Sequence, residues 1–284
     1  MFGGFQNTNN NIKTTARATQ IFGGFQSQGL QSNLKLGRDG GVPETGLVAR
    51  FRADTNITLN GSNVSAWSDF SNTYTLSQGT AANQPSYVTG RDASFFNFQP
   101  CIGFLGTTKS LNITNQFGPK TDGVRSVIAI LYNVATAPNT TSYFAYFSST
   151  AANSAGSYFI YSFDGSFGQY SLYFNPPTGT NVRPFQTNIS IFSAQNTPHI
   201  LGCEVNRTSG RFYSYYGSAA LDNRTIVSTL TDYTNGTFSV INNSSTGGWY
   251  LAELLIYNTS IAEASLSDRR QLYYYVRNRY GSLY

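Results

Sequence analysis

Charged residues are scarce in this sequence, at 11% of the chain, and it contains only one histidine and two cysteines. His199, Cys101 and Cys203 do not form a CxxC pair or any other spacing that is typical of a zinc site. We therefore expect no bound metal and no cofactor. The two cysteines either form a disulfide or remain buried free thiols, and the sequence leaves both alternatives open.

Long apolar runs and clusters of basic residues are also missing. No segment approaches the roughly 18 consecutive apolar residues of a membrane-spanning helix, and the N-terminus lacks the basic and apolar regions of a signal peptide. The net charge is +5, but the lysines and arginines are scattered and form no run that would follow a phosphate backbone. We therefore expect no membrane span, no signal peptide and no nucleic-acid partner.

The acidic residues form no catalytic pattern. The chain has four glutamates, and none lies in the closely spaced carboxylate arrangement that glycosidases of related sandwich folds use. His199 has no acidic or thiol neighbour in sequence that would suggest a catalytic triad. We therefore expect that the protein is not an enzyme. The glutamates are Glu44, Glu204, Glu253 and Glu263.

Aromatic residues, in contrast, are abundant: there are 20 tyrosines and 21 phenylalanines. They occur in many short segments that end at turns bearing glycine or asparagine, which favours a β-sandwich or barrel. The segment "LVARFRA" (47–53) alternates like a half-buried strand, and "SVIAILYNV" (126–134) is typical of a strand buried on both faces. Trp67 and Trp249 either stack on sugars or fill the core, and we interpret both as core residues. The tyrosine-rich strands between residues 143 and 173 form either a sugar platform or a packing surface.

One helix is predicted near residues 265–280. Ser265 is a suitable N-cap, and Asp268 follows it at the spacing of a capping box. Leu272, Val276 and Tyr280 recur at a spacing of four residues, with Tyr273 beside them, so that they form one apolar stripe. We expect this stripe to pack on the sandwich and the helix to end before Gly281.

Residues 1–41 differ from the rest, because they are rich in Gly, Asn, Gln and Thr and show no hydrophobic period. We predict an extended N-terminal arm, followed by a domain over residues 42–284. The arm contains the pentapeptide "FGGFQ" twice, and we interpret each copy as a partner-binding motif with aromatic anchors and flexible glycines. The alternatives are low-complexity drift or an arm that folds back on its own domain. The predicted partner-binding residues are Phe2, Gly3, Gly4, Phe5, Gln6, Phe22, Gly23, Gly24, Phe25 and Gln26.

From about residue 46 to residue 281 the order of the motifs resembles that of laminin-G-like, concanavalin A-like jelly-roll domains. An apolar strand ending at Asp54 is followed by a W-x-D-x-S motif that begins at Trp67, by the segment 82–88, and by "LAELLIYN" with the capped helix after it. The resemblance implies an all-β fold: a two-sheet antiparallel jelly-roll sandwich with an extended N-terminal arm and one C-terminal helix. It also implies a structural role for Glu253, which lies at an acidic position of non-catalytic relatives, and it supplies no metal ligand.

Such a fold does not fix a function. A low-charge jelly roll with an arm and no catalytic group favours a non-enzymatic structural component of a virus or phage particle, such as a minor capsid, decoration or tail protein. The expected location is then the virion, and the expected partners are other virion structural proteins or copies of this chain. The alternative is a glycan-binding module or adhesin, with host glycans as partners. Asp54 and Asp69 are interpreted as hydrogen-bonding loop ends at the edge of the core.

Overall fold

The structure is a computed structural model. It describes residues 41–106, 108–114, 124–135, 141–148, 157–164, 169–174, 182–187, 198–206, 211–216, 219–225, 237–242, 247–261 and 264–281. The FGGFQ motifs therefore lie outside the described residues. Gly41, Val42 and Pro43 are buried, and the side-chain amide of Gln271 donates a hydrogen bond to the carbonyl of Val42 (3.3 Å). Residues 41–43 therefore pack against the helix and sheet of the domain.

The first layer is an antiparallel sheet built around two long central strands, β8 and β17. The strands follow the order β15–β14–β13–β8–β17, and β1 and β6 pair with different halves of the free edge of β17. Strand β5 then pairs with β6. The bounds are β1 (Leu47–Arg52), β5 (Ser86–Val88), β6 (Cys101–Leu105), β8 (Val124–Ala135), β13 (Pro198–Asn206), β14 (Arg211–Tyr216), β15 (Ala219–Thr225) and β17 (Gly247–Tyr257).

The second layer is also antiparallel and follows the order β2–β3–β4–β7–β16–β9–β10–β11–β12. A single pair between Asn63 and Ser86 joins it to the first layer. The bounds are β2 (Ile57–Asn60), β3 (Asn63–Ser68), β4 (Thr75–Ser77), β7 (Lys109–Thr114), β9 (Thr141–Ser148), β10 (Ser157–Asp164), β11 (Gln169–Phe174), β12 (Val182–Thr187) and β16 (Thr237–Asn242).

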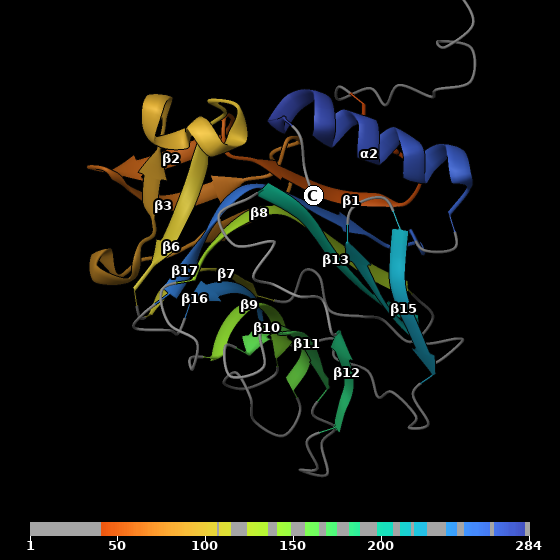
Figure 1. Cartoon of the computed structure of the whole chain (residues 1–284). Coiled ribbons are helices and arrows are strands. Elements are labelled where there is room, and N and C mark those ends of the chain that lie inside the picture. The colour runs from red at the N-terminus through yellow and green to blue at the C-terminus, as the bar shows by residue number, and fades with distance from the viewer. Residues whose placement is uncertain are drawn as a thin grey trace, which may run out of the picture.

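Three helical segments complete the described part of the chain: η1 (Ala81–Asn83), η2 (Gly90–Phe96) and α2 (Leu266–Tyr280). Figure 1 shows α2 lying across the outer face of the first layer, on the side away from β9–β12. Ser265 caps α2 by accepting a hydrogen bond from the backbone N–H of Asp268 (3.1 Å), and the helix ends at Gly281, which has a φ of 89°. The predicted helix is thus confirmed, whereas the 3-10 helix η2 was not predicted.

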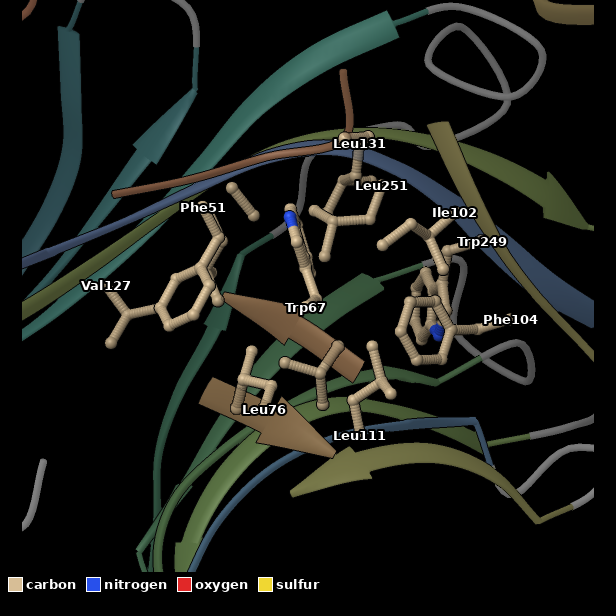
Figure 2. Packing of buried hydrophobic residues seen from close by; sticks show 14 of the residues in the cluster. Phe51, Trp67, Leu76, Ile102, Phe104, Leu111, Val127, Leu131, Trp249 and Leu251 are labelled. Atoms are coloured by element: carbon tan, nitrogen blue, oxygen red, sulfur yellow. The ribbon is translucent and has the colours of Figure 1, made fainter. Parts of the chain in front are cut away.

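The inner core lies between the two layers. Trp67 is fully buried there, and its ring meets Phe51 edge-on at a centroid distance of 5.4 Å. Figure 2 shows Trp67 among the side chains of Phe51, Leu131 and Leu251 from the first layer, with Leu76 below it. The indole Nε1 donates a hydrogen bond to the carbonyl of Arg52 (2.9 Å), so its polar edge is satisfied.

A second core lies on the outer face of the first layer, beneath α2. Strand β8 serves both cores, because Val127, Ala129 and Leu131 face the inner core while Ile128 and Ile130 face the helix. The prediction that this apolar run is buried on both faces is therefore confirmed. The predicted two-sheet antiparallel sandwich with a C-terminal helix is confirmed as well.

Candidate functional site

The position of Glu253 depends on a β-bulge in β17. Leu251 faces Leu131 of β8, but the next residue paired with that strand is Glu253, which faces Ile130. Ala252 is the extra residue, so Ala252 and Glu253 both lie on the helix side of the sheet, while Leu254 returns to the inner core. The bulge therefore directs a carboxylate into the space between the sheet and α2.

Both oxygens of the Glu253 carboxylate accept hydrogen bonds from buried side chains. Arg50 Nε lies 2.7 Å from Glu253 Oε1, and the two side chains are 1% and 0% exposed. The hydroxyls of Tyr275 and Tyr280 donate to Glu253 Oε2 at 2.8 and 2.6 Å. Arg50 Nη2 also donates to the Tyr275 hydroxyl (2.6 Å). We call these four residues the buried network; they fasten α2 to β1 and β17.

The buried network is suited to holding the helix and not to acid–base chemistry. Burial, followed by the charge of Glu253, raises the pKa of Tyr280 and of Tyr275 well above that of an exposed tyrosine. Both hydroxyls therefore keep their protons and remain donors. The carboxylate has no free oxygen directed at solvent, which supports the interpretation of Glu253 as structural.

A half-buried ionic cluster lies next to the network and consists of Arg52, Asp54 and Arg279. Arg52 donates two hydrogen bonds to Asp54, from Nε to Oδ1 (2.9 Å) and from Nη2 to Oδ2 (2.7 Å). Arg279 Nη2, from the last turn of α2, also donates to Asp54 Oδ2, and Arg279 Nε donates to the Tyr280 hydroxyl (3.3 Å). The ring of Phe70 lies 5.4 Å from Arg52 Cζ and 5.8 Å from Arg50 Cζ.

Asp54 should make folding stability depend on pH at the acid end. Burial opposes its ionisation, but the hydrogen bond from Arg52 and the charge of Arg279 outweigh it and hold the Asp54 pKa below its ordinary value. The contribution of ionised Asp54 to folding stability is therefore complete above about pH 3.9, the pKa of an aspartate in the unfolded chain. This contribution is lost as the pH falls through the lower pKa of Asp54 in the folded protein. We expect Asp54→Asn to lower stability at neutral pH by at most about 1 kcal/mol, because the cluster is partly exposed.

The check on Asp54 is thermal unfolding of wild type and Asp54→Asn between neutral pH and about pH 2, a range that spans the ordinary aspartate pKa. The difference in melting temperature between wild type and Asp54→Asn should disappear at the lowest pH, where Asp54 is protonated. Asp92→Asn, which removes an exposed carboxylate in the first turn of η2, serves as the control. A gap that persists unchanged at low pH would contradict the proposed linkage.

Three half-buried rings form an aromatic face beside η2. Phe95 from η2 stacks on Tyr132 of β8 at a centroid distance of 4.2 Å and lies 4.9 Å from Tyr250 of β17. Tyr132 and Tyr250 are cross-strand partners with ring centroids 6.2 Å apart. Gly103 makes room for the Tyr250 ring, because a Cβ at that position would lie 3.0 Å from it. We call Phe95, Tyr132 and Tyr250 the aromatic face.

Phe98 follows η2 in the chain and is exposed to solvent. It is 62% exposed, and both Phe98 and the preceding Asn97 adopt the left-handed backbone conformation, with φ of 61° and 52°. Such a conformation is costly for a bulky side chain, and exposure brings no compensating burial. Asn97 Nδ2 donates a hydrogen bond to the carbonyl of Arg279 (3.3 Å), which ties this turn to the end of α2. Strained, exposed positions of this kind are typical of contact sites.

The other residues singled out from the sequence have structural roles. Trp67 and Trp249 are both fully buried, so neither is available to stack on a sugar. Asp69 is buried and accepts hydrogen bonds from the backbone N–H groups of Ser71, Thr73 and Tyr74, which confirms its interpretation as a loop end. Cys101 is a free thiol, so the disulfide alternative is wrong, and its burial raises its pKa to about 12.

Several predictions concern parts of the chain that the structure does not describe in full. His199 and Glu204 lie in β13, opposite Leu131 and Ser126 in the register. Within the described ranges, no three or more His, Cys, Asp or Glu side chains are grouped to hold a metal ion. No helix in the described part of the chain is long and apolar enough to cross a membrane.

Comparison with known proteins identifies the fold. No protein-family model and no curated protein matches the sequence. The binding domain of Paraclostridial Mosquitocidal Protein 1 superposes with a TM-score of 0.59 and 12% identity over 84% of this chain and 55% of that one. The botulinum neurotoxin serotype D ligand-binding domain, solved with N-acetylneuraminic acid, gives 0.54 and 9% over 82% of this chain and 51% of that one.

A Trypanosoma rangeli sialidase also matches, with a TM-score of 0.54 and 14% identity over 84% of this chain and 33% of that one. This chain thus spans about half the length of the toxin domains and a third of the sialidase. At these identities the likeness establishes a shared fold alone. The resemblance to laminin-G-like domains stays a prediction.

Proposed function

We propose that this protein is a non-catalytic glycan-binding module and that the aromatic face is its sugar-contacting surface. The observation that carries the proposal is the set of three adjoining, half-buried rings on the outer face of the sheet. Sugar rings present apolar C–H faces, and aromatic side chains supply flat apolar area with few rotatable bonds.

The tyrosine hydroxyls add polarity to this surface. Burial raises the pKa of Tyr132 and of Tyr250, so both remain neutral at physiological pH. A neutral hydroxyl both donates and accepts hydrogen bonds, as sugar hydroxyls do. The fold supports the same proposal, since it is shared with domains that bind ligands or receptors, one of them solved with a sialic acid.

The non-catalytic part of the proposal rests on the carboxylates. Glu253 is sealed within the buried network, Asp54 lies between two arginines, and Asp69 caps a turn. Each of these three carboxylates is engaged by hydrogen bonds within the protein, whereas glycoside hydrolysis needs carboxyl groups that face the substrate.

The direct test is a glycan array probed with the full chain, followed by titration of the best sugar by calorimetry. We expect Tyr132→Ala and Tyr250→Ala each to weaken binding about tenfold, the equivalent of about 1.4 kcal/mol. Tyr250→Phe should lose less sugar affinity than Tyr250→Ala, because the aromatic ring remains. Phe98→Ala tests whether the exposed ring extends the same surface.

Tyr274→Ala is the matched control, since Tyr274 is 48% exposed on α2 but lies outside the aromatic face. Its substitution should leave the affinity unchanged. Absence of any glycan ligand, or binding that survives both tyrosine substitutions, would overturn the proposal.

The structural role in a virus particle, with docking through the FGGFQ motifs, stays a prediction. The arm that would carry it lies outside the described residues. The comparisons favour the glycan-binding alternative over the particle role, because the proteins sharing the fold include toxin binding domains.

A further inference from the structure

The ionic cluster carries an unbalanced positive charge. Arg52 and Arg279 share the single carboxylate of Asp54, while the adjacent pair of Arg50 and Glu253 is neutral as a unit. Among the described residues, the tyrosines that interact electrostatically with the cluster are Tyr87, Tyr275 and Tyr280, and burial raises the pKa of each, so that they stay protonated. The cluster therefore has one more positive charge than negative charge.

Each guanidinium also has donors that the protein does not use. Arg52 commits Nε and Nη2 to Asp54, and Arg279 commits Nη2 to Asp54 and Nε to Tyr280. Among the described residues, neither Nη1 group has a hydrogen-bond partner. The two side chains are 15% and 22% exposed, and neither Nη1 atom is among the fully buried polar atoms without a hydrogen-bond partner, so both Nη1 groups retain some contact with solvent.

The cluster is held in place before any ligand arrives. Asp54 fixes both guanidinium groups, and Tyr280 links Arg279 to the buried network through Glu253. Phe70 lies against Arg52 and is 39% exposed, which places an apolar surface beside the unused donors. Fixed donors lose little conformational entropy on binding, so they hold an anion better than mobile surface lysines do.

We propose that Arg52 and Arg279 form a binding site for the carboxylate of an acidic sugar, with Phe70 as its apolar wall. Arginine presents paired N–H groups that match the two oxygens of a carboxylate, and the surplus charge of the cluster is then neutralised. This site does not depend on the aromatic face: it would stand even if the aromatic face bound no sugar.

The test is calorimetric titration of the full chain with D-glucuronate and, separately, with D-glucose, which differ in the carboxylate. Glucuronate should bind at least about tenfold more tightly than glucose, the equivalent of about 1.4 kcal/mol. Acetate, which carries the carboxylate without a sugar ring, should bind the same site more weakly. Equal binding of acetate and glucuronate would show a general oxyanion site and would overturn the assignment to a sugar acid.

The variants Arg279→Gln and Arg52→Gln should each weaken glucuronate binding about tenfold or more. Arg277→Gln is the matched control: it removes the same charge from the same helix, but Arg277 is exposed and has no ion-pair partner among the described residues. Equal loss in Arg277→Gln would show nonspecific attraction to a basic surface and would overturn the proposal.

Two further variants test the site if Arg279→Gln fails to fold and distinguish it from the aromatic face. Arg279→Lys retains the charge without the paired donors, so it should bind glucuronate with an intermediate affinity even if Arg279→Gln unfolds. Tyr250→Ala should leave glucuronate binding unchanged. If Tyr250→Ala loses glycan binding but still binds glucuronate, the aromatic face and the arginine site are independent. The failure of one proposal can then be told apart from the failure of the other.

Discussion

Replacing Glu253 by Gln is expected to lower the free energy of unfolding by about 3–5 kcal/mol, because the buried guanidinium of Arg50 then loses the carboxylate of its buried ion pair. The carboxylate is 0% exposed and accepts hydrogen bonds from three side chains on β1 and α2. An amide of the same shape can accept some of these bonds but cannot neutralise Arg50. Urea unfolding followed by the fluorescence of the buried tryptophans measures the change.

A second variant separates loss of the charge pair from loss of packing. Arg50→Met combined with Glu253→Gln removes both charges, so it should cost less than the sum of the two single substitutions. Asp92→Asn is the surface control and should change stability by no more than about 0.5 kcal/mol. If Glu253→Gln costs less than about 1 kcal/mol, a typical value for one ordinary hydrogen bond, the buried network does not hold α2 to the sheet.

Replacing Trp67 by Ala should also cost about 3–5 kcal/mol, since it opens a cavity at the centre of the inner core. Trp67 is 0% exposed, and Figure 2 shows side chains from both layers around it. The substitution also leaves the carbonyl of Arg52 without its indole donor. Chemical denaturation monitored by far-UV circular dichroism gives the free energy without relying on tryptophan fluorescence.

Trp67→Phe is the graded comparison. The phenylalanine keeps a large ring but lacks the indole N–H. The free energy of unfolding of Trp67→Phe should therefore lie between those of wild type and Trp67→Ala. Leu59→Ala in the adjacent strand β2 is the control, because Leu59 is 46% exposed. Similar losses in Leu59→Ala and Trp67→Ala would mean that the packing between the two layers does not depend on the indole.

Features encoded over short stretches of sequence were predictable. The capped helix after Ser265 and the doubly buried run in β8 agree with the structure, because caps and hydrophobic periods act between residues within a few positions of each other. The core roles of Trp67 and Trp249, and the turn around Asp69, also agree. In each case the side chain's size or its local hydrogen-bonding capacity decided the outcome.

By itself, then, the sequence determined an all-β sandwich with one capped C-terminal helix and a set of core aromatics. Only the tertiary structure decided which charges meet. Arg50 and Glu253 are 203 positions apart, and Asp54 and Arg279 are 225 apart, so no local pattern pairs them. A one-residue bulge in β17 turns Glu253 toward α2, and strand alternation alone does not predict a bulge. The aromatic face likewise needs η2 to fold over β8 and β17, where strands distant in sequence bring Tyr132 and Tyr250 together.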